Sequence, residues 1–281
     1  MKTTNSKATK AKDSQNYIKK KQFFDQLLTI FGRKPILEAL QEKGSKLYRL
    51  HLAESNKKAK ILDDIIALAK KQGAEITYHD RKALSRISKN AKQDQGIAAD
   101  LICAGYQNYQ RFLEQQKQSS KPFELLALDG ITNPQNLGMI IRSATAGHID
   151  GILLPKQGCA RLDALVIKAS AGTLFKAPIL RCDKLTDALK DCQNAGAKIC
   201  GLSSHAKMTL GQYGNQNKEG SQTAQINTFT SNIFVLGNET DGVSKTVEAL
   251  CDQWLSIPMN NEIESLNVAV TASLIAFRKI I

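Results

Sequence analysis

The sequence predicts an α/β protein that combines a small N-terminal α/β domain with a larger C-terminal domain built on a mostly parallel sheet. Short apolar runs typical of buried strands alternate with helical patterns along the 281 residues. The charge divides where the two domains meet. Residues 1–122 contain 25 Lys and Arg against 12 Asp and Glu, whereas residues 123–281 contain 14 basic and 14 acidic residues. A positive excess confined to one part of the chain indicates that the two domains have different tasks.

The small domain is predicted to span residues 29–104. Its apolar residues follow helical and strand periodicity in turn, and a glycine follows each expected helix, where glycine commonly ends one. The elements are expected, in chain order, as a helix at 36–40, a strand at 47–53, a helix at 59–71, and strands at 75–78 and 96–103. This alternation predicts a compact α/β unit.

The preceding residues 1–28 are predicted to form a disordered basic arm. The first 22 residues hold seven lysines and one acidic residue, and they carry too little apolar surface to fold. A mitochondrial presequence is the alternative interpretation. Such segments are rich in arginine, however, and the first arginine of this chain is Arg33.

The larger domain is predicted to span residues 123–281, after a linker at 105–122 that is rich in Gln, Lys and Ser and has a helical turn or two near Tyr109. Its apolar strands are expected at 125–128, 151–154, 199–202, 233–236 and 254–257. Residues 205–232 are polar and interrupt this pattern, so they are predicted to form a mobile surface insertion.

The composition is typical of a soluble cytoplasmic protein. No apolar run approaches the roughly 18 residues of a membrane span, and the first residues lack the apolar core of a secretory signal. The six cysteines show no CxxC spacing, so no metal site is expected. The basic excess favours a nucleic-acid backbone as partner, because Lys and Arg contacts to phosphates release condensed counterions. On charge alone, a soluble protein with a lysine-rich tail is the alternative.

The candidate functional residues lie in three polar segments, each directly after a predicted strand. In the first, Asn133-Pro134 makes a turn and Asn136 is expected to cap the next helix. Gly138 lies one turn before Arg142, and its small size is expected to leave room for a ligand beside the guanidinium group. The alternative is a capped helix with a solvated arginine.

The second segment, Gly237–Ser244, has the glycine spacing of a phosphate-binding loop, but Val243 stands where the lysine must be. Its glycines allow the backbone to approach a ligand closely. The alternative is that the segment is an ordinary link between a strand and a helix. The third segment runs from Ile257 to Val270, and Ser265 or Asn267 is expected to cap a C-terminal helix that packs on the core. A dinucleotide site of the GxGxxG type is excluded because that motif is absent.

In this order and spacing, the three segments resemble motifs 1, 2 and 3 of the SpoU (TrmH-type) RNA ribose methyltransferases. That family belongs to the SPOUT superfamily, whose C-terminal domain forms a deep trefoil knot. The N-terminal part resembles the family's small L30e-like RNA-binding domain through Gly32–Leu40 and Asp94–Ile97. The pairing is most similar to the RlmB group, which methylates the 2′-hydroxyl of a guanosine in 23S ribosomal RNA. One departure is Asn261, which stands where the family usually has glycine; asparagine tolerates the left-handed geometry expected there.

The resemblance implies an enzyme that uses S-adenosyl-L-methionine, needs no metal, and acts on RNA as a homodimer. It implies that Arg142 either accepts the proton of the ribose hydroxyl or positions that hydroxyl, since the arginine pKa lies above about 12. The other implied catalytic residues are Asn136, Glu239 and Asn267. The implied cofactor-binding residues are Gly237, Ile257, Met259, Ser265 and Leu266. A transfer RNA ribose methyltransferase and a non-catalytic RNA-binding ribosome-assembly factor are the alternatives.

Overall fold

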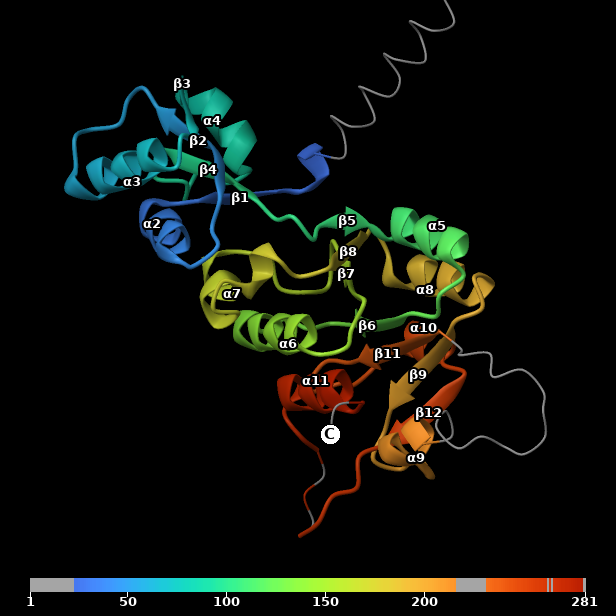
Figure 1. Cartoon of the computed structure of the whole chain (residues 1–281). Coiled ribbons are helices and arrows are strands. Elements are labelled where there is room, and N and C mark those ends of the chain that lie inside the picture. The colour runs from blue at the N-terminus through green and yellow to red at the C-terminus, as the bar shows by residue number, and fades with distance from the viewer. Residues whose placement is uncertain (1–22, 216–230, 262, 264, 280–281) are drawn as a thin grey trace, which may run out of the picture.

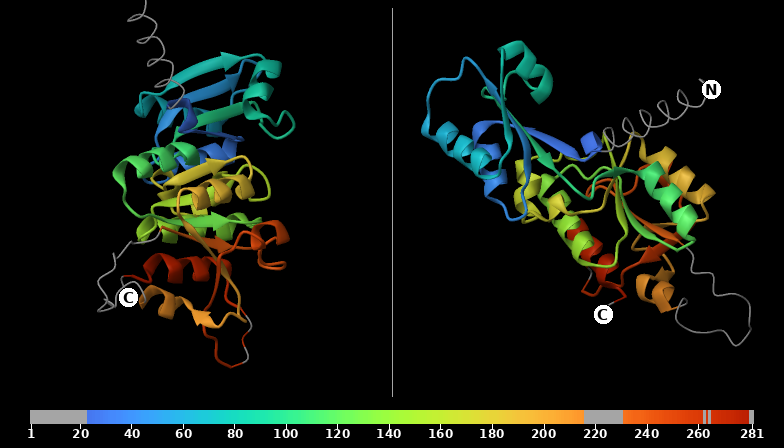
Figure 2. Two further views of the ribbon diagram at one scale, coloured as in Figure 1. Left: turned by 90° about the vertical axis from the view of Figure 1, so that its right-hand side faces the viewer. Right: turned by 45° about the horizontal axis from the view of Figure 1, so that its top comes forward.

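The computed structural model describes residues 23–215, 231–261, 263 and 265–279. Most of the predicted basic arm and the middle of the predicted insertion lie outside these ranges. The described chain forms two sheets, and the N-terminal domain lies at one end of the molecule with the larger sheet beyond it (Figure 1 and Figure 2). No helix within the described ranges is both long and apolar enough to cross a membrane.

The N-terminal sheet has the strand order β1-β4-β2-β3, in which only β2 and β3 run parallel. Its strands are β1 (Leu27–Phe31), β2 (Leu47–Ala53), β3 (Glu75–His79) and β4 (Ile97–Ile102), and its helices are α2 (Arg33–Gln41), α3 (Lys60–Lys71) and α4 (Arg81–Ser88). Helices α2 and α3 pack together against one face of the sheet, and Leu84 of α4 packs on the other. The five predicted elements are confirmed, with bounds that differ by a few residues.

Two elements of this domain differ from the prediction. Strand β1 begins at Leu27, inside the segment predicted as an arm, because Leu28 and Ile30 alternate with less buried neighbours and bury their side chains. Helix α4 was not predicted, since Leu84 is its only buried large apolar residue. Its start is fixed by Asp80, whose carboxylate accepts a hydrogen bond from the Ala83 amide at 2.7 Å.

The larger sheet has the order β10-β12-β9-β11-β6-β7-β8-β5, and all of its recorded strand pairs are parallel. Its strands are β5 (Gln107–Asn108), β6 (Glu124–Leu128), β7 (Gly151–Pro155), β8 (Ile179–Cys182), β9 (Lys198–Leu202), β10 (Met208–Thr209), β11 (Asn232–Leu236) and β12 (Gln253–Ser256). Its helices are α5 (Tyr109–Ser119), α6 (Pro134–Ala146), α7 (Ala164–Ala169), α8 (Leu185–Asn194), α9 (Leu210–Asn215), α10 (Lys245–Glu248) and α11 (Val268–Phe277), with a 3₁₀ turn at Thr173–Phe175. The predicted parallel α/β architecture is confirmed.

Both faces of this sheet are covered, which explains why its strands read as continuous apolar runs. On β6, Leu126 and Leu128 face the side on which α6, α7 and α11 pack. Leu125 and Ala127 face the other side, together with buried residues of α5 and α8. The strand order reverses between β6 and β11, because β7 and β8 follow on one side and β9 and β12 lie on the other. Such a reversal is the place where open parallel sheets commonly bind ligands, at the carboxyl ends of the strands.

The segment predicted as a linker, residues 105–122, instead contains β5 and α5. Tyr109 and Phe112 of α5 are buried, and Phe112 packs edge to face against Phe123. The tyrosine hydroxyl also donates a 2.7 Å hydrogen bond to Asp191 of α8. The polar composition of α5 concealed this role, because two aromatic side chains one turn apart suffice to hold the helix on the sheet.

Part of the predicted insertion also belongs to the ordered fold. Strand β10 pairs with β12 at the sheet edge, and Leu210 of α9 is buried. The Tyr213 hydroxyl donates to Asn232 at 2.6 Å. Residues 216–230 lie outside the described residues, so the prediction for that part stays a prediction.

The two domains are joined by close packing as well as by the chain. Helix α2 packs against α7, and one continuous apolar cluster contains buried residues of both domains (Figure 1). Two glycines allow this approach: a Cβ on Gly172 would lie 2.7 Å from the Lys43 carbonyl oxygen, and a Cβ on Gly105 would lie 2.1 Å from that of Ala177. The N-terminal domain is therefore held in a defined position on the larger one.

Candidate active site

The three polar segments meet at the carboxyl edge of the larger sheet. Strands β6 and β11 are parallel neighbours in register, with Leu128 opposite Leu236, so the segments that follow them begin side by side. The third segment follows β12, which lies two strands from β11 in the same direction. Each of the three segments follows a strand of the sheet, as the sequence predicted, and their meeting at one edge is a finding of the structure.

The loop after β11 is folded back on itself and tied to the segment after β6. Asn238 and Gly242 form an antiparallel bridge with N–O distances of 2.8 and 2.9 Å. A Cβ on Gly237 would lie 2.3 Å from the Gly242 carbonyl carbon, so this glycine is required by the loop itself. The Asn238 side chain donates to the Gly130 carbonyl oxygen at 2.8 Å, which fixes the loop against the first segment.

Asn136 joins all three segments through its side-chain amide. Its Nδ2 donates to the Glu239 carboxylate of the second segment, and its Oδ1 accepts a 3.1 Å hydrogen bond from Asn267 Nδ2 of the third. Asn136 is 7% exposed, so both of its polar atoms need these partners. The expectation that Asn136 caps α6 is wrong: Asn133 is the N-cap, and its Oδ1 accepts from the Gln135 amide at 2.8 Å. Asn136 is thereby free to make tertiary contacts.

Arg142 lies on α6 after the buried residues Leu137, Ile140 and Ile141, and its side chain is exposed. Within the described residues it has no ion-pair or hydrogen-bond partner. The helix that carries it is held between α7 and α11, and Ser143 shares a 2.8 Å hydrogen bond with Ser273 of α11. Arg142 is therefore an unpaired guanidinium group on a well-supported helix, close in sequence to the Asn136 junction.

The expected role of Gly138 is wrong, because α7 fills the space beside it. A Cβ at this position would lie 2.4 Å from the Ala169 Cβ and 2.9 Å from the Val166 carbonyl oxygen. Gly138 thus lets two helices approach closely and leaves no room for a ligand there.

A Gly138→Ala variant should therefore be less stable. The extra methyl group must displace backbone atoms of α7, and such overpacking costs about 1–3 kcal/mol, which outweighs the roughly 1 kcal/mol that alanine gains in a helix. Thermal unfolding measures the effect. Gly211→Ala is the matched control, since its Cβ would meet nothing nearer than 3.9 Å. An unchanged melting temperature for Gly138→Ala would contradict this account.

The third segment supplies half-buried apolar side chains and one helix cap. Ile257, Met259 and Leu266 are half-buried, whereas Ser265 is exposed. The cap of α11 is Asn267, whose Oδ1 accepts from the Ala269 amide at 2.8 Å, and this decides between the two expected caps. Asn261 adopts the left-handed conformation with a φ of 57°, as predicted for the residue that stands in place of glycine.

Three site-building residues were not predicted from the sequence. Besides Asn133 and Asn238, Asp129 accepts a 2.7 Å hydrogen bond from the Ser244 amide and closes the far end of the second segment. A polar residue at the last position of a buried strand is a signal that could have identified Asp129. The contact of Asn238 with Gly130 spans 108 residues of chain and has no local signal.

Comparison with known proteins assigns this fold and site to a class of RNA-modifying enzymes. The chain belongs to the SpoU rRNA Methylase family, whose model matches residues 124–277. A second model, described as RNA 2′-O ribose methyltransferase substrate binding, matches residues 29–107. The protein is therefore an RNA methyltransferase of the SpoU class with a separate N-terminal substrate-binding domain, as the sequence predicted.

Individual relatives and structures agree with this assignment. A protein of Mycolicibacterium vanbaalenii named as an uncharacterized tRNA/rRNA methyltransferase is 32% identical over 246 residues, which cover 88% of this chain and 74% of the relative. YacO of Bacillus subtilis, named as a TrmH family tRNA/rRNA methyltransferase, is 29% identical over 88% of this chain and 93% of its own. The SpoU methyltransferase AviRb of Streptomyces viridochromogenes, solved with the cofactor AdoMet, has the same fold with a TM-score of 0.53, 20% identity, and coverage of 91% of this chain and 89% of that one.

Proposed function

We propose that the protein transfers a methyl group from S-adenosyl-L-methionine to the 2′-hydroxyl of a ribose in RNA, on a guanosine of 23S ribosomal RNA. The observation that supports this most directly is the hydrogen-bonded junction of Glu239, Asn136 and Asn267. It ties the three motif segments together on the helix that also carries Arg142, which has no ion-pair or hydrogen-bond partner among the described residues, in a chain whose N-terminal part carries the whole positive excess. That division fits an enzyme in which one domain holds RNA and the other modifies it.

The residues of the second and third segments suit the cofactor. Ile257, Met259 and Leu266 keep part of their apolar surface exposed, which suits an adenine ring, and Ser265 adds an accessible hydroxyl. The turn at Gly237 brings backbone groups to the carboxyl edge of the sheet, where they are available to a polar ligand. When bound, S-adenosylmethionine supplies a methyl group that its sulfonium sulfur already activates.

In the proposed mechanism the protein positions the hydroxyl and polarises it. The Arg142 guanidinium donates hydrogen bonds to the ribose hydroxyl and the adjacent phosphate, which aligns the oxygen with the methyl carbon. Because a guanidinium group keeps its proton in proteins, Arg142 acts as an orienting group in preference to a proton acceptor. Asn136 holds the Glu239 carboxylate and Asn267 in place, so that the loop around the cofactor keeps its shape. No step requires a metal ion.

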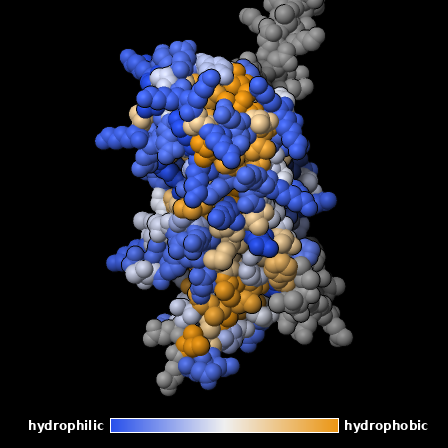
Figure 3. All heavy atoms as spheres, turned by 90° about the vertical axis from the view of Figure 1, so that its left-hand side faces the viewer, coloured by the Kyte–Doolittle hydropathy of each residue, from blue (hydrophilic) through white to orange (hydrophobic). Residues whose placement is uncertain are grey.

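We also propose that the enzyme acts as a homodimer through α6 and α11. Met139 and Val270 are large apolar residues on these packed helices, and they are 40% and 47% exposed. Leu165 on the neighbouring α7 is 55% exposed. Figure 3 shows the side of the molecule that lies on the left in Figure 1, where apolar side chains gather in patches among polar ones. Exposed apolar groups of this kind favour contact with a second copy, which would place Arg142 of α6 near the interface.

The cytoplasm is the proposed location. The six cysteines are all free, and four of them are buried, as expected for a protein of a reducing compartment. Bacterial relatives such as YacO of Bacillus subtilis carry the names of RNA-modifying enzymes, whose substrates are cytoplasmic.

Mapping of 2′-O-methylated nucleosides in RNA from a strain that lacks the gene tests the proposed function. We expect one guanosine of 23S ribosomal RNA to lose its methyl group, and the purified protein to restore it with S-adenosylmethionine. Loss of methylation in a transfer RNA instead would establish the tRNA alternative. An unchanged methylation pattern in both RNA classes, together with no cofactor binding in calorimetry, would favour the non-catalytic assembly factor.

A further inference from the structure

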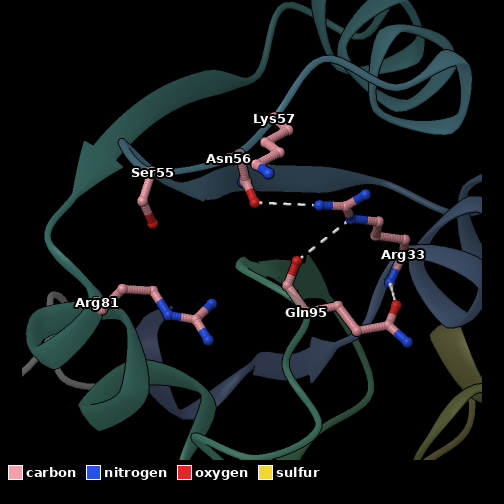
Figure 4. Close-up of a pocket in the computed structure, with 6 residues that line it drawn as sticks. All are labelled: Arg33, Ser55, Asn56, Lys57, Arg81 and Gln95. Carbon is pink, nitrogen blue, oxygen red and sulfur yellow. Dashed lines mark hydrogen bonds between the residues drawn. The ribbon is translucent and has the colours of Figure 1, made fainter.

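A hollow in the N-terminal domain gathers three basic side chains. It has a volume of about 600 Å³ and is lined by Arg33, Ser55, Asn56, Lys57, Arg81 and Gln95. Arg33 reaches it from one side, with Asn56 and Lys57 beside it, and the Arg81 guanidinium points in from the other side (Figure 4). These residues come from the start of α2, the segment between β2 and α3, the start of α4 and the segment before β4.

The orientation of Arg33 is fixed by neutral groups. Its Nε donates to the Gln95 carbonyl oxygen at 3.3 Å, and its Nη2 donates to Asn56 Oδ1 at 3.3 Å. The Arg33 backbone amide donates to Gln95 Oε1 at 3.0 Å, so the side chain and backbone of Gln95 both hold this arginine. None of these partners carries a negative charge, and the arginine therefore keeps its full positive charge at the hollow.

The backbone beneath the hollow is held in an unusual conformation. Gln95 and Gly96 have successive φ values of 52° and 77°, and a non-glycine residue at such a φ is costly. A Cβ on Gly96 would lie 2.2 Å from Asn56 Oδ1, and Asn56 Nδ2 donates to the Gly96 carbonyl oxygen at 2.7 Å. The strained turn thus holds the two acceptors that orient Arg33.

The charge of the hollow is only partly compensated. Asp94 lies 3.5 Å from Arg81, but this carboxylate is only 2% exposed and also accepts from Ser88 Oγ and the Gly96 amide. Lys57 makes no ion pair with any residue that the structure describes. Two of the three cations therefore lack a carboxylate, and an anion between them would relieve their mutual repulsion.

We infer that this hollow binds a backbone phosphate of the RNA substrate. The inference rests on the proposed function and deepens it, since it assigns the position where the substrate-binding domain contacts RNA. Guanidinium forks and a lysine suit phosphate oxygens, and the amide and hydroxyl groups of Gln95 and Ser55 suit the adjoining sugar. The volume is ample for a phosphate together with its sugar, whereas a water occupies about 30 Å³.

Two matched pairs of variants test the inference. Lys57→Gln and Arg81→Gln remove charges that line the hollow, and Lys58→Gln and Lys82→Gln remove exposed charges from the neighbouring positions. Binding of a fluorescein-labelled RNA hairpin of mixed sequence is measured by anisotropy over a range of salt concentrations. The logarithm of the binding constant falls as the logarithm of the salt concentration rises. We expect each hollow variant to make this slope less steep by about 0.7 to 1, which is the contribution of one phosphate contact. The neighbouring variants should change it by less than half as much.

Equal effects of all four variants would overturn the inference, because the positive charge of the domain would then attract RNA in general, without a specific phosphate site at the hollow. Efficient competition by inorganic phosphate alone would also overturn it and would indicate a site for a small free anion. Thermal unfolding of each variant identifies losses caused by misfolding. RNA binding is read without methyl transfer, so the two proposals are separable. If the natural protein methylates no RNA while the hollow variants still change the slope, the proposed function fails and the hollow assignment stands.

Discussion

An Arg142→Ala variant is expected to lose methyl-transfer activity by about a hundredfold to a thousandfold, the usual effect of removing one donor that acts on the reacting oxygen. Arg142 has no structural partner among the described residues, and its side chain is exposed, so its removal leaves no group unpaired. The affinity for S-adenosylmethionine should therefore stay nearly unchanged. Single-turnover transfer to RNA and calorimetry of cofactor binding measure the two quantities separately.

Two further variants make the Arg142 result interpretable. Arg142→Lys keeps the charge but loses the planar fork, and it should retain only a small part of the activity if two oxygens must be held at once. Arg111→Ala removes an arginine from α5, on the opposite face of the sheet, and should leave the transfer rate as it is. Substantial turnover by Arg142→Ala would remove the assigned role from this residue.

An Asn136→Asp variant is expected to lose methyl transfer at neutral pH and to regain part of it as the pH falls. Aspartate has the shape of asparagine, but its ionised form cannot donate to Glu239, and two carboxylates then face each other. The repulsion raises the pKa of one of the two carboxylates. At low pH that carboxylate is protonated, and its hydroxyl can again donate a hydrogen bond to the other. Above that raised pKa the folded state should lose about 1–3 kcal/mol, because Asn136 is buried.

The pH dependence of transfer and of the melting temperature tests the Asn136 prediction. Asn108→Asp is the matched control, since it adds the same charge at the exposed N-cap of α5, on the opposite face of the sheet, where aspartate caps a helix as well as asparagine does. It should behave like the natural chain at every pH. A flat pH profile for Asn136→Asp would show that the link to Glu239 does not hold the site together.

The parts of the fold that the sequence predicted are those with a strong local pattern. Strands β6, β7 and β11 are buried on both faces, so their short apolar runs identify them. The two-residue edge strands β5 and β10 leave no pattern at all, and Tyr109 and Phe112 are the only buried residues of α5. The deep trefoil knot rests on the family resemblance, and it stays a prediction.

In the candidate site, too, the features with a local sequence pattern could be predicted, whereas those that depend on contacts between distant residues could not. The meeting of the three segments could be predicted because parallel strands end at the same edge of a sheet. The role of Asn136 could not, since its partners lie 103 and 131 residues away and its local context also fits a helix cap. Gly138 was misread for a similar reason: a glycine on a helix face indicates a close neighbour, and only the tertiary structure identifies α7 as that neighbour.

The packing of α2 on α7 fixes the distance between the two positions at which RNA is proposed to bind. Because one apolar cluster runs through both domains, the span between the basic hollow and Arg142 is set by the protein and cannot stretch like a tether. With the roles proposed for the hollow and for Arg142, an RNA engages both positions only if its own folding places a phosphate and the target ribose at that separation. Denatured RNA keeps every nucleotide of the sequence but loses this spacing, and it should be a poor substrate for that reason.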